Sequence, residues 1–433
     1  MTVFRKFDVC ASYESSVVKS PPSPSRKTLP AILMTTRTII LLTILTTFLL
    51  GCNSTVDQQK ADKQLRDNLS GEWEIIIEEE NSTDDYPPPL FYFPQGMTVS
   101  NDSIEFYLGF FKEDRDNITG KRTRLYLGNI VPYKTDNDSI IIKNPITDSW
   151  EFKWRFVGRV NDTLQLAIND TTVIRFKKLT YNLDTLPEFD QIIYSSSGCY
   201  GSCPIIDISI TKEGNVLFQG EGYVKPLGFY SGNLDSKAKN YIFGKFRRAN
   251  PLGLQDNYSV SHTDDQSLTT TFIQNGKIVK TIHDYGMAGT NELIWAYIPI
   301  SNIHTTIKLD SLPLDDPFYP KLHYFTFKKD GLILPLEKSE SFYLWTELKK
   351  SKQTDVNFKS KYKLTFSGNY TYWGPDPNEA RHHKYEIKSV TTDGQFFKFE
   401  FKNEQSITYD LGYNFIDRNF KPTDFRKPNE WEE

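Results

Sequence analysis

The sequence has little cysteine and no strong bias of charge. It holds four cysteines among 433 residues. These are too few for a small scaffold held together by disulfides, and a chain of this length can bury a core without them. The formal net charge is -4. Because nucleic-acid-binding proteins carry clustered positive charge, we expect no nucleic-acid partner.

Several catalytic motifs are absent as well. The sequence has no Gly-x-Ser-x-Gly turn, no His-Glu-x-x-His zinc motif, no phosphate-binding glycine loop and no EF-hand loop. We therefore predict no catalytic residue, no metal ligand and no cofactor. What the sequence has in quantity is aromatic residues, with 30 Phe and 24 Tyr, which favours β-structure. The length indicates two or three domains.

The N-terminal region has the features of a signal peptide. An apolar run covers residues 38–50 and follows Met34 and Arg37 in the sequence. A run of roughly 13 residues with a basic flank is typical of a signal peptide and too short for a comfortable transmembrane helix. Residues 1–30 are rich in Ser, Pro and basic residues and have no apolar periodicity. We therefore predict that translation begins at Met34.

The apolar run ends in Leu49-Leu50-Gly51-Cys52, which resembles the lipobox of bacterial lipoproteins. The resemblance implies that Cys52 is lipidated and that residues 1–52 hold the signal region, so acyl chains anchor the protein to the membrane. Two alternatives stay open: a cleaved secretory signal that leaves Cys52 as a free thiol, and an uncleaved membrane anchor.

Residues 53–68 are polar and charged, and we expect them to form a solvated tether. They lack the compact acidic run that resembles a surface-export signal in some bacteria. We therefore expect an outer-membrane lipoprotein that faces the periplasm.

Residues 69–180 contain short β-branched or aromatic runs bounded by Asn, Asp or Gly. This pattern predicts an antiparallel β-barrel or a strongly curved sheet. Gly71-x-Trp73 on the first strand and Arg175 on the last resemble lipocalin-like domains, where the Trp closes one barrel end and an Arg packs across it. The resemblance implies a cavity for a small apolar ligand. The alternative is a barrel filled by its own side chains.

The sequence of residues 187–312 predicts a central α+β domain in which strands alternate with two helices. Asp235 and Ser236 are expected to cap the first helix, and Asn250-Pro251 to end it. Asn275-Gly276 between two β-branched runs predicts a hairpin with a type I′ turn.

The same region contains the motif Cys199-x-Gly201-x-Cys203-Pro204 before an Ile-rich strand. Together with the later segment Thr263-Asp264-Asp265 and then Asp284-Tyr285, the motif resembles the domain of unknown function 6438. That family is found largely in lipoproteins and exported proteins of Bacteroidota. The resemblance implies a cell compartment and a bacterial lineage. It implies no activity, because none is established for the family.

Cys199 and Cys203 allow three interpretations. In an oxidising compartment the simplest is a disulfide that stiffens the turn. A redox pair would need the N-terminus of a helix beside it to stabilise a thiolate. The residues after Cys203 are instead typical of a strand. A metal site would need further ligands, for which His262 and His283 are candidates. Asp264-Asp265 nearby is expected to be a solvated loop or cap rather than a catalytic carboxylate pair.

Residues 320–420 predict a second small α+β domain. Ser339 is expected to cap a helix that runs to about Lys350. Residues 370–375 and His382-His383 lie in or beside a long loop, where exposed aromatics could bind a glycan or a partner, or could pack on their own sheet. Residues 421–433 are expected to be a disordered tail.

The sequence as a whole predicts a β-rich α+β protein with an N-terminal barrel and two α+β domains. The leading hypothesis is a membrane-anchored exported lipoprotein without enzymatic activity. It would bind an envelope protein or a small apolar ligand. The alternative is a thiol-redox or metal-binding protein or enzyme centred on Cys199 and Cys203, with His262, Asp264 or His283 assisting.

Overall fold

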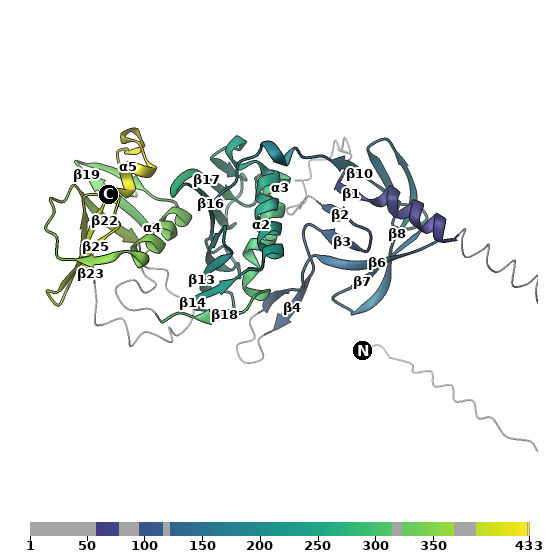
Figure 1. Ribbon diagram of the computed structural model, residues 1–433, viewed down its shortest axis with the longest axis horizontal. Helices are drawn as coiled ribbons and strands as arrows, with labels where there is room; N and C mark the ends of the chain where they lie inside the picture. Colours follow the sequence, from purple (N-terminus) through teal and green to yellow (C-terminus); the bar gives the residue numbers. More distant parts are fainter. Residues whose placement is uncertain are drawn as a thin grey trace, which may run out of the picture. The chain divides into compact units, whose positions relative to one another are not determined.

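Residues 62–433 form a unit built on three large β-sheets, and a computed structural model shows their arrangement (Figure 1). The structure describes residues 58–77, 95–115, 122–313, 323–367, 387–430 and 432. The expected signal region with Cys52, residues 370–375 and His382-His383 lie outside these ranges. In the described part no helix is long and apolar enough to cross a membrane. The prediction of a β-rich α+β fold with an N-terminal barrel is confirmed.

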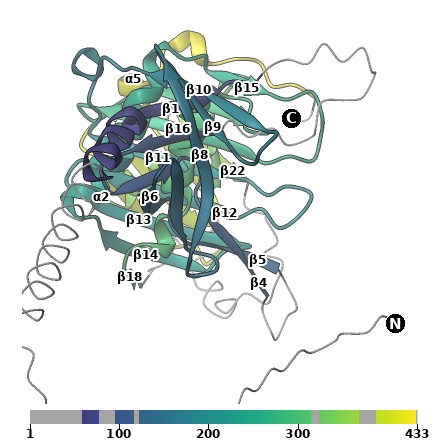
Figure 2. The ribbon, with the colours of Figure 1, turned by 90° about the vertical axis from the view of Figure 1, so that its right-hand side faces the viewer.

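The first sheet is a closed barrel in which every neighbouring pair of strands is antiparallel. Side chains of Trp73, Leu164 and Leu166 point inward and have no exposed surface, since alternate residues of a strand face opposite sides. Figure 2 shows β8, β9, β10 and β1 side by side. The barrel strands, in spatial order, are β1 (Gly71–Ile75), β10 (Val173–Leu179), β9 (Thr163–Ala167), β8 (Ser149–Val160), β7 (Ser139–Asn144), β6 (Ile130–Asp136), β3 (Ser103–Phe106) and β2 (Gly96–Val99), while β4 (Phe111–Arg115) and β5 (Arg122–Tyr126) form a separate hairpin.

A helix precedes the barrel where the sequence predicted a solvated tether. Residues 58–69 are helical, and Leu65 and Leu69, one turn apart, are buried in the barrel core. The indole Nε1 of Trp73 donates a hydrogen bond to the carbonyl of Leu69 over 2.8 Å. The guanidinium over the Trp73 ring belongs to Arg159, at 5.2 Å from the ring centre. Arg175, which the lipocalin resemblance implied, is exposed on β10.

The second sheet has two helices on one face, as Figure 1 shows. Asp235 caps α2 (Ser236–Ala249) by accepting a hydrogen bond from the amide of Ala238 over 2.7 Å, and Asn250 ends it in the left-handed conformation. Asn275 and Gly276 have φ values of 53° and 69°, so the predicted cap and hairpin turn are both confirmed. The remaining elements are β11 (Gln191–Ser196), β12 (Ile205–Thr211), β13 (Asn215–Gly222), β14 (Gly228–Asn233), β15 (Asn257–Ser259), β16 (Ser267–Gln274), β17 (Lys277–Tyr285), α3 (Asn291–Ser301) and β18 (Leu309–Ser311), in the spatial order β15-β17-β16-β11-β12-β13-β14-β18.

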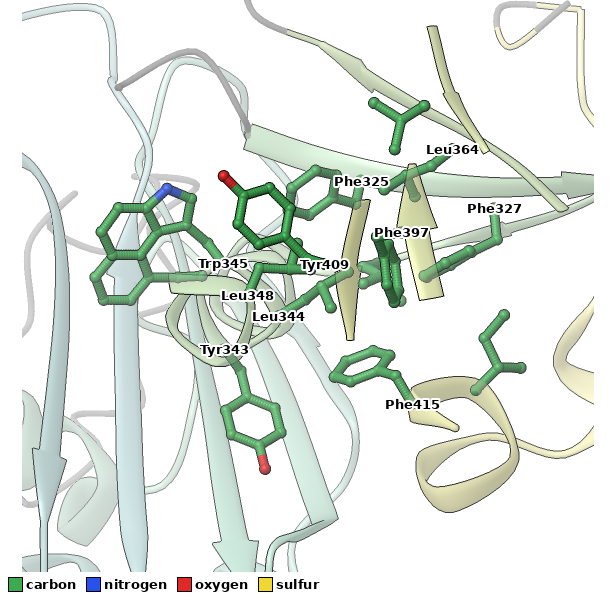
Figure 3. Packing of buried hydrophobic residues seen from close by; sticks show 14 of the residues in the cluster. Phe325, Phe327, Tyr343, Leu344, Trp345, Leu348, Leu364, Phe397, Tyr409 and Phe415 are labelled. Atoms are coloured by element: carbon green, nitrogen blue, oxygen red, sulfur yellow. The ribbon is translucent and has the colours of Figure 1, made fainter. Parts of the chain in front are cut away.

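The third sheet packs its apolar face against helix α4 (Lys338–Lys350). Phe325, Phe327 and Phe397 from the sheet meet Leu344 and Trp345 from the helix (Figure 3). This core also takes in Ile193 and Ile273 from the second sheet, so α4 lies between two sheets. The third sheet has the order β20 (Leu332–Pro335), β19 (His323–Lys329), β22 (Tyr362–Ser367), β23 (Ile387–Thr392), β24 (Phe396–Phe401), β25 (Ser406–Asp410) and β21 (Lys352–Thr354), followed by α5 (Phe415–Asn419).

Two expectations for this region are wrong. The residue that caps α4 is Glu337, whereas Ser339 lies inside the first turn with its Oγ 2.7 Å from Thr271 Oγ1. The tail from residue 421 was expected to be disordered. Instead, Arg426 pairs with the backbone of Ile333, because β20 is an edge strand with free hydrogen-bonding groups.

Candidate functional site

Cys199 and Cys203 form a disulfide in the turn that joins β11 to β12, as predicted. Their Cα atoms lie 5.7 Å apart, within the range that a disulfide needs. Between the two cysteines, Tyr200 is 89% exposed. The turn therefore presents a large aromatic side chain to solvent from a cross-linked backbone.

A second loop braces the disulfide turn. The amide of Tyr200 donates to the carbonyl of Asp264 over 2.9 Å. The side-chain amide of Gln266 donates to the carbonyls of Ser197 and Pro204 over 2.8 and 2.7 Å. These bonds hold both ends and the tip of the turn. Because its conformation is already fixed, the turn would lose little further conformational entropy on binding.

The candidate histidines have separate partners. His262 lies in the bracing loop with its Nε2 2.5 Å from Asp265 Oδ2. His283 lies on β17 with its Nδ1 3.4 Å from Glu337 Oε2, and the hydrogen bond to Glu337 raises the pKa of His283. Within the described ranges, no three His, Cys, Asp or Glu side chains are arranged to hold a metal ion.

Asp284 is fully buried and holds a turn. Its two carboxylate oxygens accept hydrogen bonds from the amides of Ala288 and Gly289 over 2.7 and 3.1 Å. Burial raises the pKa of Asp284. A Cβ on Gly289 would lie only 2.7 Å from the carboxylate, so this close approach requires glycine. Asp284 therefore orders the segment before α3.

The sequence did not reveal a buried ion cluster beneath the disulfide turn. Lys338 at the start of α4 is 3% exposed. Its Nζ lies 3.1 Å from Asp207 Oδ2 and 2.8 Å from Glu221 Oε1, and it donates to the carbonyl of Ser196 over 3.1 Å. Burial by itself would lower the pKa of Lys338, but the two carboxylates raise it above its ordinary value.

Glu340, also in the first turn of α4, is 7% exposed. Its carboxylate accepts hydrogen bonds from Thr281 Oγ1 over 2.7 Å and from the amide of Glu337 over 2.9 Å. Burial raises the pKa of Glu340 to about 7. Glu340 and the Lys338 cluster are thus both buried at the start of α4, whereas Tyr200 on the disulfide turn is open to solvent.

Comparison with known families supports the resemblance of the central region. Residues 190–304 match the model of the Domain of unknown function DUF6438. The match includes the disulfide turn, Asp207, Glu221 and Asp284, and it ends before α4. A comparison with curated proteins gave no match.

Replacing Cys199 and Cys203 together with serine should lower the free energy of unfolding by roughly 2 kcal/mol, because the unfolded chain regains the entropy of a short closed loop. Urea unfolding of the purified protein measures the change. Reduction of the wild type is the matched control and should cause the same loss. A wild type whose stability does not respond to reductant would contradict the structural role of the disulfide.

The pKa of Glu340 predicts that stability falls with rising pH. An ordinary Glu has a pKa near 4.5 and the folded protein raises it to about 7. The protonated form therefore stabilises the fold below pH 4.5, and this contribution is lost as the pH rises through 7. We expect a loss of about 3 kcal/mol between pH 4.5 and 8, measured by urea unfolding.

A Glu340→Gln variant should show a flatter pH profile than the wild type and be more stable at pH 8. The pKa values of His283 and Asp284 are also raised, and their contributions to stability fall in the same direction. His283→Gln and Asp284→Asn are therefore needed as controls to separate the three groups. Equal slopes for the wild type and Glu340→Gln would contradict the assignment to Glu340.

Proposed function

We propose that this protein is a lipid-anchored exported protein that binds a protein partner through the disulfide turn of its central domain. The anchor would be acyl chains on Cys52. The binding element would be Tyr200 on the braced turn. No chemical reaction is assigned to the protein.

The observation that carries this proposal is the exposure of Tyr200 on a preorganised turn. Tyr is enriched among the residues that dominate protein interfaces. Here it is 89% exposed, while the disulfide and the bonds from Gln266 and Asp264 hold its backbone. A disulfide also favours an oxidising compartment, which agrees with the lipobox at Cys52.

Two alternatives receive less support. A redox role would favour a helix start beside one sulfur, but a strand, β12, begins at Ile205, two residues after Cys203. A small apolar ligand would need space inside the barrel. The side chains of Trp73, Leu164 and Leu166 occupy the interior, which supports the filled barrel.

Changing Cys52 to Ala should abolish labelling by a palmitate analogue and lower the share of the protein in the membrane fraction, since acyl chains supply the anchor. Fractionation and labelling in the native host measure both effects. Ser54→Ala, two residues after Cys52, is the control and should leave both unchanged. Unaltered labelling of the Cys52→Ala protein would contradict the lipid anchor.

Changing Tyr200 to Ala should weaken partner capture roughly tenfold or more, as expected for a central aromatic residue of an interface. A photo-reactive amino acid in place of Ser202 would report capture as a discrete cross-linked band in intact cells. Val356→Ala, at a residue 47% exposed in another part of the chain, is the control. A band of equal intensity with Tyr200→Ala would exclude Tyr200 as the binding element.

A further inference from the structure

The outer wall of the barrel carries a group of apolar and basic side chains on three neighbouring strands. Trp150 is 45% exposed and Phe152 is 53% exposed, and Ile146 in the preceding turn is 45% exposed. We call this group the β6–β8 patch. It consists of Pro132, Lys134, Ile141, Lys143, Ile146, Trp150 and Phe152.

The strand register makes the patch continuous. Phe152 on β8 lies opposite Ile141 on β7, and Ile141 lies opposite Lys134 on β6. Trp150 lies opposite Lys143, and the Nζ of Lys134 is 4.9 Å from the centre of the Trp150 ring. Residues that alternate with these, such as Ile140 and Ile142, point into the barrel core. A clustered apolar surface of this kind marks an interaction site.

The barrel uses a different part of its wall to contact the central region. Glu72 on β1 pairs with Arg248 of α2 over 2.8 Å, and Glu105 on β3 pairs with Lys245 over 2.5 Å. Next to these ion pairs, the Tyr107 ring packs on Trp295 of α3 with ring centres 4.6 Å apart. The patch on β6, β7 and β8 lies on other strands and takes no part in these contacts.

The chain itself indicates what lies near the patch. Asp62 in the entry helix accepts a hydrogen bond from Thr135 Oγ1 over 3.4 Å. Thr135 alternates with Lys134 and lies on the same face of β6 as the buried Tyr133, so the helix enters at the end of the barrel and the patch lies on the adjoining outer wall. Cys52 is ten residues before Asp62. Even a fully extended chain of that length spans at most about 35 Å. A lipid on Cys52 would therefore keep the barrel, with the patch on its wall, within that distance of the bilayer.

We infer that the β6–β8 patch is a membrane-contacting surface. Trp150, Phe152 and Ile146 enter the interfacial layer of the bilayer, and Lys134 faces the lipid phosphates. Trp favours that layer because its ring is apolar and its N–H is polar, and a lysine beside it can keep its ammonium group in water. The inference rests on the proposed lipid anchor for its setting, and it adds a second point of membrane contact.

Vesicle binding of an unlipidated chain tests this inference. Residues 53–433 contain every element that the structure describes and lack Cys52, so the test is independent of lipidation. The probe is a sedimented vesicle of phosphatidylethanolamine and phosphatidylglycerol. Trp150→Ser with Phe152→Ser should reduce partitioning into vesicles roughly tenfold, because two half-exposed aromatic side chains no longer leave water.

Val160→Ser is the matched control, since Val160 is on the same strand, is 61% exposed and lies outside the patch. It should bind vesicles as the wild type does, and thermal unfolding should show that both variants remain folded. Failure of the wild type to bind vesicles would overturn the inference. So would a wild-type dimer, seen by sedimentation, that the double variant converts to a monomer, because the patch would then join two copies of the chain.

Discussion

The buried contact of Lys338 with Asp207 and Glu221 sets the position of helix α4, and much of the described fold depends on that position. One ammonium group joins the start of α4 to two neighbouring strands, β12 and β13. The same helix supplies Leu344, Trp345 and Leu348 to the core of the third sheet. If α4 moved along the second sheet, Lys338 would lose its carboxylates and the third sheet would lose its apolar cover together.

Such a cluster is better understood as a constraint on geometry than as a source of stability. Burying three charges away from water costs free energy, and their mutual attraction offsets only part of that cost. Replacing one of the three side chains would leave a buried charge without a partner and would cost several kcal/mol. The cluster therefore penalises every arrangement in which Lys338 does not reach Asp207 and Glu221. Hydrogen bonds of Ser339 with Thr269 and Thr271 tighten the same contact.

The Lys338 cluster also connects to the proposed binding turn. Lys338 donates to the carbonyl of Ser196, the last residue of β11, and Ser196 Oγ donates to the carbonyl of Pro204 over 2.7 Å. The disulfide turn lies between these two positions. Its base is thus fixed by a helix outside the matched family region, and its tip is fixed by the loop that contains Asp264 and Gln266.

Local signals determined a substantial part of this protein from its sequence alone. Asp235 and Asn250 mark the ends of α2, Asn275-Gly276 marks a hairpin, and the spacing of Cys199 and Cys203 suits a disulfide. Each depends on a few adjacent residues, because caps and turns are stabilised within one or two turns of chain. The short β-branched and aromatic runs of the first region, bounded by Asn, Asp or Gly, likewise sufficed to predict an antiparallel barrel or a strongly curved sheet.

Only the tertiary structure decided which polar residues are buried and which side chains they contact. Lys338 is more than a hundred residues from Asp207 and Glu221 in the sequence, so no spacing could join them. Residues 58–69 are polar enough to indicate a tether, but the barrel core buries Leu65 and Leu69 and stabilises a helix there. Ser339 suits a helix cap locally, yet Thr271 binds it inside the helix, because contacts with a distant strand outweigh a local preference.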